Sequence, residues 1–378
     1  MKNKLLSAFL FMTSLTLSAC EDVADKYKEN IFVPQEPSTE YTADYDDGEN
    51  IYINVKIAID KKGWESQSPE FFRTKLEDQW KLINARFNNC GQKGDVKLTR
   101  KYVYKPDLDD IIVYDGCSYW GENGADSKVL AKLDKNIFKL MVIYDFFYEG
   151  GENGEYGGGC GDSNGIGTIL VINASEDARD KYNNHFDDNT YRAITHELGH
   201  FRGVIDLYAE VIDGTKNPVN GESYMPISCL MNNMTYTPDA ESVWSDYAVK
   251  IINKAGNIKL AGMINEYMYE DFADKLVFKV TQNGVPADAT IKLYPQAGSY
   301  KNEISSAVAY QYSVTNGSIE MDARPVFFKN PDYKWDRTAI YLVEASYGEV
   351  KKYVWLADYM LHNSGIDGEK TYTVNFEF

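Results

Sequence analysis

The chain is short of basic residues and has no closely spaced pair of cysteines, and each shortage excludes a class of function. Lysine and arginine number 39 against 57 aspartates and glutamates, giving a net charge of −18. A field of that sign repels phosphate backbones, so nucleic acid is excluded as a partner. None of the five cysteines forms a CxxC pair, which a cysteine zinc knuckle would need. Apolar residues at 44% and charged residues at 25% exclude wholesale disorder and fibrous structure.

Long apolar runs are also scarce, and the first lies at the N-terminus. Residues 1–20 contain two lysines, an apolar stretch from Leu5 to Leu17 and a short exit of small residues. A core of that length is too short for a permanent membrane helix and is typical of a secretory leader. The exit, LSAC, resembles a bacterial lipobox. The resemblance implies a lipoprotein signal peptide over residues 1–19 and a lipid anchor on Cys20.

A polar, acidic segment with little periodicity follows the anchor. Residues 20–49 are therefore predicted to form a flexible, lipid-anchored tether. Glu21 and Asp22 resemble the acidic tag of some surface-exposed Gram-negative lipoproteins. We expect an outer-membrane lipoprotein exposed at the cell surface, with the periplasmic face as the alternative. The lipid on Cys20 would be the protein's only contact with the membrane.

Four cysteines remain beyond the anchor: Cys90, Cys117, Cys160 and Cys229. An exported chain with an even number of cysteines is expected to form disulfides, and four cysteines allow three pairings. The favoured pairing joins Cys90 to Cys117 and Cys160 to Cys229.

The globular part is predicted to be α+β, with a first domain over residues 50–268. Apolar residues at helical spacing predict a helix at 71–87, and a second helical pattern covers 238–254. Residues 150–167 are glycine-rich and are predicted to form a mobile loop without the Walker-type lysine of a phosphate site. Alternation and short apolar runs predict strands at 51–60, 110–114, 137–147 and 168–173.

The composition changes near residue 274. Alternating strands separated by Asn-Gly and Tyr-Gly turns predict an all-β module over residues 274–378, a β-sandwich. Its opening, VTQNGVPADATIKLYPQAG, is similar to that of prealbumin-like sandwich modules appended to secreted peptidases.

Chemistry is concentrated in the segment TYRAITHELGHFRGVID. On a helix His196 and His200 project from one face and can hold a single cation. Glu197 points beside that cation, where a carboxylate can take a proton from a metal-bound water. A glycine at 203 can adopt positive φ, end the helix and reverse the chain, bringing Asp206 within reach as a third ligand. Zinc (Zn²⁺), a redox-silent Lewis acid, suits such a site in an oxidising compartment.

These five residues resemble the motif of the metzincin clan of zinc endopeptidases, in the HExxHxxGxxD form of families such as the snapalysins. The resemblance covers roughly residues 50–256 and implies a mixed twisted sheet, an active-site helix and a methionine turn. Thr168–Asn173 would be the edge strand that pairs with an extended substrate. Met231 is the expected turn methionine, with Met225 and Met234 as less favoured candidates.

The resemblance implies a monomeric zinc endopeptidase that cleaves extracellular proteins or peptides. Where some families place a zinc-assisting tyrosine this chain has Asn233, so such a tyrosine would come from elsewhere, for example Tyr236. A thermolysin-like third ligand at Glu241 is disfavoured, because one extra residue turns that carboxylate by about 100° on a helix.

Two other readings stay open. The chain could be a catalytically inactive surface lipoprotein whose C-terminal sandwich binds host protein or glycan. Calcium (Ca²⁺) could occupy the acidic, glycine-rich loops, although no calcium-ligand spacing is recognisable. His185 and His362 stand apart from the motif and are expected to be core or surface residues.

Overall fold

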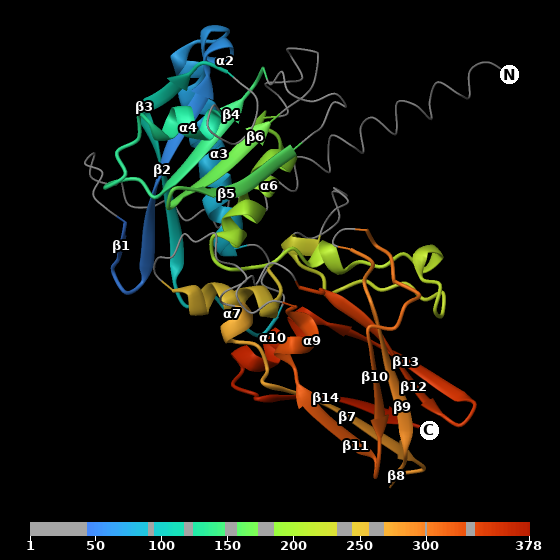
Figure 1. Cartoon of the computed structure of the whole chain (residues 1–378). Coiled ribbons are helices and arrows are strands. Elements are labelled where there is room, and N and C mark those ends of the chain that lie inside the picture. The colour runs from blue at the N-terminus through green and yellow to red at the C-terminus, as the bar shows by residue number, and fades with distance from the viewer. Residues whose placement is uncertain are drawn as a thin grey trace, which may run out of the picture. The chain divides into compact units, whose positions relative to one another are not determined.

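The computed structural model (Figure 1) describes residues 44–89, 94–116, 124–147, 157–172, 185–232, 244–256, 268–298, 301–329 and 337–378. No helix within these ranges is long and apolar enough to cross a membrane. The chain divides into two compact units, Met1–Cys90 with Thr99–Glu197 and Gly91–Leu98 with Leu198–Phe378. The predicted boundary between residues 268 and 274 does not coincide with this division. Several predicted features lie outside the described residues: the signal peptide, Cys20, most of the tether, Cys90, Cys117, Asn233, Met234, Tyr236 and Glu241.

The first unit is built on a six-stranded sheet of order β1-β2-β4-β6-β5, with β3 paired to β2. The pairs β2/β3, β2/β4 and β4/β6 are parallel, whereas β1/β2 and β5/β6 are antiparallel. The predicted strands at 51–60, 110–114, 137–147 and 168–173 are confirmed with shifted ends. The strands are β1 (Tyr45–Asp46), β2 (Asn50–Asp60), β3 (Lys101–Tyr114), β4 (Leu140–Asp145), β5 (Gly157–Ser163) and β6 (Ile166–Ile172).

Helix α3 (Pro69–Asn89) confirms the predicted helix and covers one face of this sheet. Its buried face consists of residues at helical spacing, so burial of that face stabilises both elements. Asn84 and Asn88, one turn apart, hydrogen-bond the backbone of Tyr104 and Tyr102 at 2.7–2.8 Å and so cover one edge of β3. The helix residues with at most 1% exposure on this face include Phe72, Leu76, Trp80, Ile83 and Phe87.

The other face carries a separate apolar cluster beneath helix α4 (Ala125–Leu130). Successive residues of β4 point to opposite sides, and Met141 and Ile143 belong to this second cluster. A short helix, α2 (Lys61–Glu65), follows β2 and is capped by Asp60, whose side chain accepts from the Gly63 N–H at 2.7 Å. Coverage of both faces is what a largely parallel sheet requires.

The prediction of an irregular loop over residues 150–167 is wrong for its second half. Gly157–Ser163 forms β5, which pairs antiparallel with all of β6. Asn164 and Gly165 connect the two strands with φ of 55° and 81°, the positive angles of a tight hairpin turn. Thr168–Asn173 is therefore not the edge strand, since β6 lies between β4 and β5. The edge is β5.

The last residues of the expected tether are also ordered. Tyr45 and Asp46 pair with Ile51 and Tyr52 of β2, and the Asn54 N–H donates to the Asp44 carboxylate at 2.8 Å. The flexible segment predicted for residues 20–49 therefore does not extend over these positions.

The second unit contains two four-stranded sheets, of order β10-β9-β12-β13 and β11-β7-β14 with β8 beside β7. All pairs are antiparallel except β14/β7. They coincide with the strand pattern predicted beyond residue 274. The strands are β7 (Lys275–Gln282), β8 (Val285–Pro286), β9 (Ala289–Pro295), β10 (Tyr310–Val314), β11 (Ser318–Asp322), β12 (Ile340–Tyr347), β13 (Val350–Ala357) and β14 (Thr371–Glu377).

Helices also occur in this unit, so the prediction of an all-β module is wrong. Helix α9 (Arg324–Phe327) precedes β12, and α10 (Asp358–Ile366) follows β13 directly, burying Leu361 completely. Earlier in the unit are α7 (Asp246–Ala255), in the predicted region 238–254, and the short 3₁₀ helices η1 (Leu207–Glu210), η2 (Gly214–Lys216) and η3 (Leu230–Asn232).

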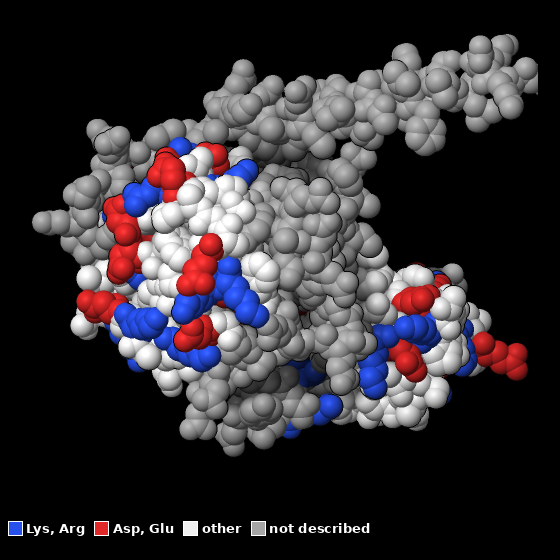
Figure 2. Space-filling model, turned by 90° about the horizontal axis from the view of Figure 1, so that it is seen from above, with Lys and Arg blue, Asp and Glu red and all other residues white. Residues whose placement is uncertain are grey.

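Acidic and basic side chains are mixed on the face drawn in Figure 2, where the Lys and Arg of the described residues lie among Asp and Glu. Among the described residues of that face, the negative net charge does not gather into a patch of one sign.

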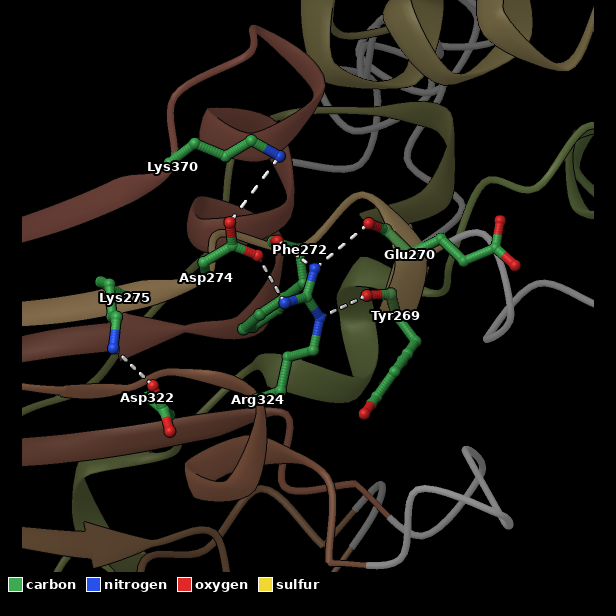
Figure 3. Close-up of polar contacts among 8 residues, drawn as sticks. All are labelled: Tyr269, Glu270, Phe272, Asp274, Lys275, Asp322, Arg324 and Lys370. Carbon is green, nitrogen blue, oxygen red and sulfur yellow. Dashed lines mark hydrogen bonds and ion pairs between the residues drawn. The ribbon is translucent and has the colours of Figure 1, made fainter.

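The segment leading into β7 is fixed by one side chain, that of Arg324 (Figure 3). Its guanidinium donates to the carbonyl oxygens of Tyr269, Glu270 and Phe272 at 2.8, 3.2 and 2.9 Å, and to the Asp274 carboxylate at 2.6 Å. The pKa of Asp274 is lowered, chiefly because its carboxylate accepts the hydrogen bond from Arg324. Four acceptors held by one cation define where β7 begins.

We expect Arg324→Met to lower the free energy of unfolding by about 2 kcal/mol, because two partly buried carbonyls, those of Tyr269 and Phe272, and the exposed carbonyl of Glu270 lose their donor. Urea unfolding followed by circular dichroism measures the change. Lys370→Met is the matched control: its ammonium lies 3.7 Å from Asp274 but is 76% exposed, so its removal should cost little. Equal losses for the two variants would contradict this assignment.

Candidate metal centre

Helix α6 (Asp188–His200) carries both histidines of the motif. Its first turn is capped by the Asp187 carboxylate, which accepts from the Thr190 N–H at 2.9 Å. Ile194 and Leu198, at most 1% exposed, set its buried side. Local capping and an apolar stripe are thus enough to explain why this segment is helical.

The helix ends as the sequence predicts, at Gly203. This glycine has φ of +86°, its N–H donates to the His200 carbonyl at 2.9 Å, and the Val204 N–H donates to the Gly199 carbonyl at 3.1 Å. The two bonds form a Schellman motif, which satisfies the last carbonyls of a helix and requires a left-handed residue. The chain then reverses towards Asp206.

The same turn orients the His200 ring. Nδ1 lies 2.8 Å from the Val204 carbonyl oxygen, which can only accept, so we assign the proton to Nδ1 and the lone pair to Nε2. A backbone carbonyl on the far nitrogen is the usual support of a metal-binding histidine. His200 is only 7% exposed, which limits its motion.

The structure brings His196, His200 and Asp206 together, with one donor atom of each within 4.8 Å of the others. His200 Nε2 and Asp206 Oδ1 are 3.1 Å apart. Two ligand atoms of a tetrahedral zinc ion, each about 2.0–2.1 Å from the metal, lie roughly 3.3 Å apart. The lone pairs of His200 Nε2 and Asp206 Oδ1 repel each other at this distance unless a proton or a cation lies between them. Their separation is close to that of two ligand atoms on one zinc ion, so these residues fit such an ion.

Glu197 is not among these three donors. It belongs to a second group, formed with His200 and Cys160, whose ligand atoms also lie within 4.8 Å of one another. Cys160 belongs to β5, so the edge strand passes beside the candidate base. Sequence spacing gave no signal for this neighbour.

Met231 is the buried methionine of the predicted turn. It is fully buried in η3, whereas Met225 is 66% exposed. A Cβ added to Gly199 would lie 3.2 Å from Met231 Sδ and 2.7 Å from Trp244 Cη2. Gly199, for which the motif spacing gives no signal, therefore lets Met231 and Trp244 pack against the helix next to His200.

Asp206 leads directly into η1. It occupies the N-cap position, yet its side chain makes no capping hydrogen bond and its carboxylate faces His200 instead. At the other end of η1, Glu210 is completely buried near Asp358 and Arg337. Burial first, and the Asp358 carboxylate second, raise the pKa of Glu210 well above its ordinary value of 4.5.

The predicted pairing of Cys160 with Cys229 is wrong, since neither forms a disulfide. Cys160 lies in β5 of the first unit. Cys229 is 3% exposed in the second unit, where it accepts from the Ser245 N–H at 3.5 Å and burial raises the pKa of its thiol.

The two remaining histidines belong to the core, as expected. His185 Nε2 lies 3.1 Å from the Asp145 carbonyl oxygen and its ring stacks on Phe146 at 4.0 Å. His362 Nδ1 lies 2.9 Å from the Tyr247 hydroxyl, and burial lowers the pKa of His362 to about 3. Within the described ranges, no group of three or more carboxylates that could hold calcium occurs.

Comparison of the sequence with protein-family models gives no match. Comparison with curated proteins gives none either.

We expect Glu210→Gln to stabilise the protein increasingly as the pH rises from about 5 to 8. A raised pKa in the folded state means that the unfolded chain loses this proton first, so the stability of the parent protein falls with pH from the unfolded pKa up to the folded one. Glutamine keeps the shape and has no proton to lose. Urea unfolding at several pH values gives the difference, and a pH-independent difference would contradict a buried neutral glutamic acid.

Proposed function

We propose that the chain is a zinc-dependent endopeptidase with a metzincin-type domain that hydrolyses peptide bonds of extracellular proteins. The observation that carries the proposal is the convergence of His196, His200 and Asp206, with donor atoms within 4.8 Å of each other, at a helix end formed by Gly203. Three protein ligands leave one open position, the arrangement of a catalytic rather than a structural zinc site. When bound, zinc supplies Lewis acidity to a water molecule and to the scissile carbonyl.

The protein's own residues supply the proton transfer and the orientation. Glu197 takes the proton of the attacking water and delivers it to the leaving amine. The Val204 carbonyl oxygen holds His200 with its lone pair directed at the metal position. An anionic ligand at Asp206 lowers the charge of the centre compared with a site of three histidines, and so weakens its pull on the water.

Strand β5 offers a place for an extended substrate. Among the described strands it pairs with β6 alone, and it contains four glycines, which allow close approach of another backbone. Cys160 on this strand lies near Glu197. A peptide added to this edge would therefore run past the catalytic base. The lipid anchor proposed at Cys20 would hold this activity at the outer membrane, facing the cell surface.

Glu197→Gln should abolish most hydrolysis of casein while leaving zinc bound, because the base is removed and the ligands are not. We expect a fall in kcat of at least about 10²-fold, measured together with the zinc content. Glu222→Gln, at an exposed glutamate, is the control and should keep the parent activity. Equal rates for the parent and Glu197→Gln would remove Glu197 as the base and with it this peptidase assignment, and a parent that binds zinc without hydrolysing casein would favour the inactive surface lipoprotein.

Cys160→Phe should inhibit hydrolysis, since the larger side chain would occupy the edge of β5 beside Glu197. Cys160→Ser, which keeps the size of the side chain, is the matched control and should keep the parent activity. Zinc content should stay the same in both. Hydrolysis at the parent rate by Cys160→Phe would show that the substrate does not pass along this strand.

A further inference from the structure

The turn that bears Asp206 is attached to the C-terminal sheet. Gln296, which directly follows β9, donates its side-chain N–H to the Ala209 carbonyl oxygen in η1 at 2.6 Å. Both residues are at least nine-tenths buried. A short hydrogen bond shielded from water is a strong positional constraint.

A second attachment lies one residue further along η1. The Glu210 side chain lies beside Asp358, which begins α10, and Asp358 accepts from Arg337 Nε at 2.6 Å. Glu210 and Asp358 are completely buried. Among the described residues, neither Glu210 carboxyl oxygen has a partner apart from the Asp358 carboxylate, so a protonated Glu210 that donates to Asp358 is the arrangement that would satisfy both groups and hold the end of η1.

The chain after η1 continues onto the same sheet. Ile212 bridges to Tyr224, and the Asp213 N–H donates to the Asn302 carbonyl at 3.0 Å. The Tyr224 ring packs on Trp355 of β13 with centroids 5.3 Å apart. The segment from η1 to Tyr224 is thus built against the C-terminal module rather than tethered loosely to it.

Asp206 lies between two fixed points. The Schellman turn fixes the chain as far as Val204, and η1 begins at Leu207, which is fully buried. Only Ile205 and Asp206 separate them. A shift of η1 therefore moves the carboxylate relative to His200, while the two histidines keep the geometry that the helix gives them.

We propose that the C-terminal sheet positions the third metal ligand: Gln296 and the Glu210–Asp358 pair act through η1 to hold Asp206 at the metal centre. The inference rests on the proposed zinc site and deepens it. Gln296 and Glu210 are positioning residues, since neither touches the metal position. The C-terminal module is then a structural part of the site and not only an appended domain.

The test measures zinc affinity of the full chain by competition with a chromophoric chelator. We expect Gln296→Ala and Glu210→Ala each to raise the Kd for zinc about tenfold, the lower end of the range for supporting residues. Glu210→Gln, which keeps a neutral hydrogen-bonding group beside Asp358, should restore the parent value. Arg324→Met is the control, because it disturbs the same unit without touching η1.

Two further readouts separate positioning from general destabilisation. The visible absorption of the cobalt-substituted protein should change in Gln296→Ala and not in Arg324→Met, because loss of one ligand alters the cobalt coordination. In an Asp206→Ala background, Gln296→Ala should have no additional effect on the zinc Kd. An unchanged Kd and spectrum in Gln296→Ala, or an equal effect in both backgrounds, overturns the inference. A parent protein that binds no zinc overturns the proposed metal centre itself.

Discussion

The candidate site depends on one helix ending. At Gly203 the backbone takes a left-handed conformation that costs a residue with a Cβ about 1 kcal/mol or more. The hydrogen bonds of that turn satisfy the last carbonyls of α6, the Val204 carbonyl fixes the His200 ring, and the reversed chain brings Asp206 to 3.1 Å from His200. The turn that ends the helix therefore also brings the residues of the candidate site together.

That locality explains which parts of the site could be predicted from sequence. His196, His200, Gly203 and Asp206 belong to one helix and its turn, so helical periodicity and the conformational freedom of glycine are enough to bring them together. The supporting residues cannot be found in this way. Gln296 reaches η1 from a point 87 positions along the chain, and no spacing rule connects residues across such a distance.

The sheets show the same limit in another form. Strands with alternating or apolar sequences, such as β2, β6 and β9, follow their patterns closely. Strand β5 was missed because its glycines give no hydrophobic period, although Asn164-Gly165 is a typical hairpin signal. Its neighbour β6 provides the pairing that its own composition does not. Helix α10 was missed because only Asp358 separates its first apolar residues from those of β13, so length and burial, not pattern, decide between strand and helix.

The buried cluster behind η1 raises the question of why this part of the second unit is polar. Glu210 and Asp358 share one nearby guanidinium, that of Arg337, and an apolar core of equal volume would be no less stable. Apolar contacts, however, tolerate sliding of a short 3₁₀ helix, whereas the hydrogen bond from the Gln296 amide to the Ala209 carbonyl oxygen has one favourable direction. The position of a metal ligand must be held to within about 0.5 Å, and directional hydrogen bonds provide that precision better than apolar contacts do. If Asp206 is a metal ligand as proposed, a fixed position of its carboxylate is the advantage that offsets the cost in stability of this buried polar cluster.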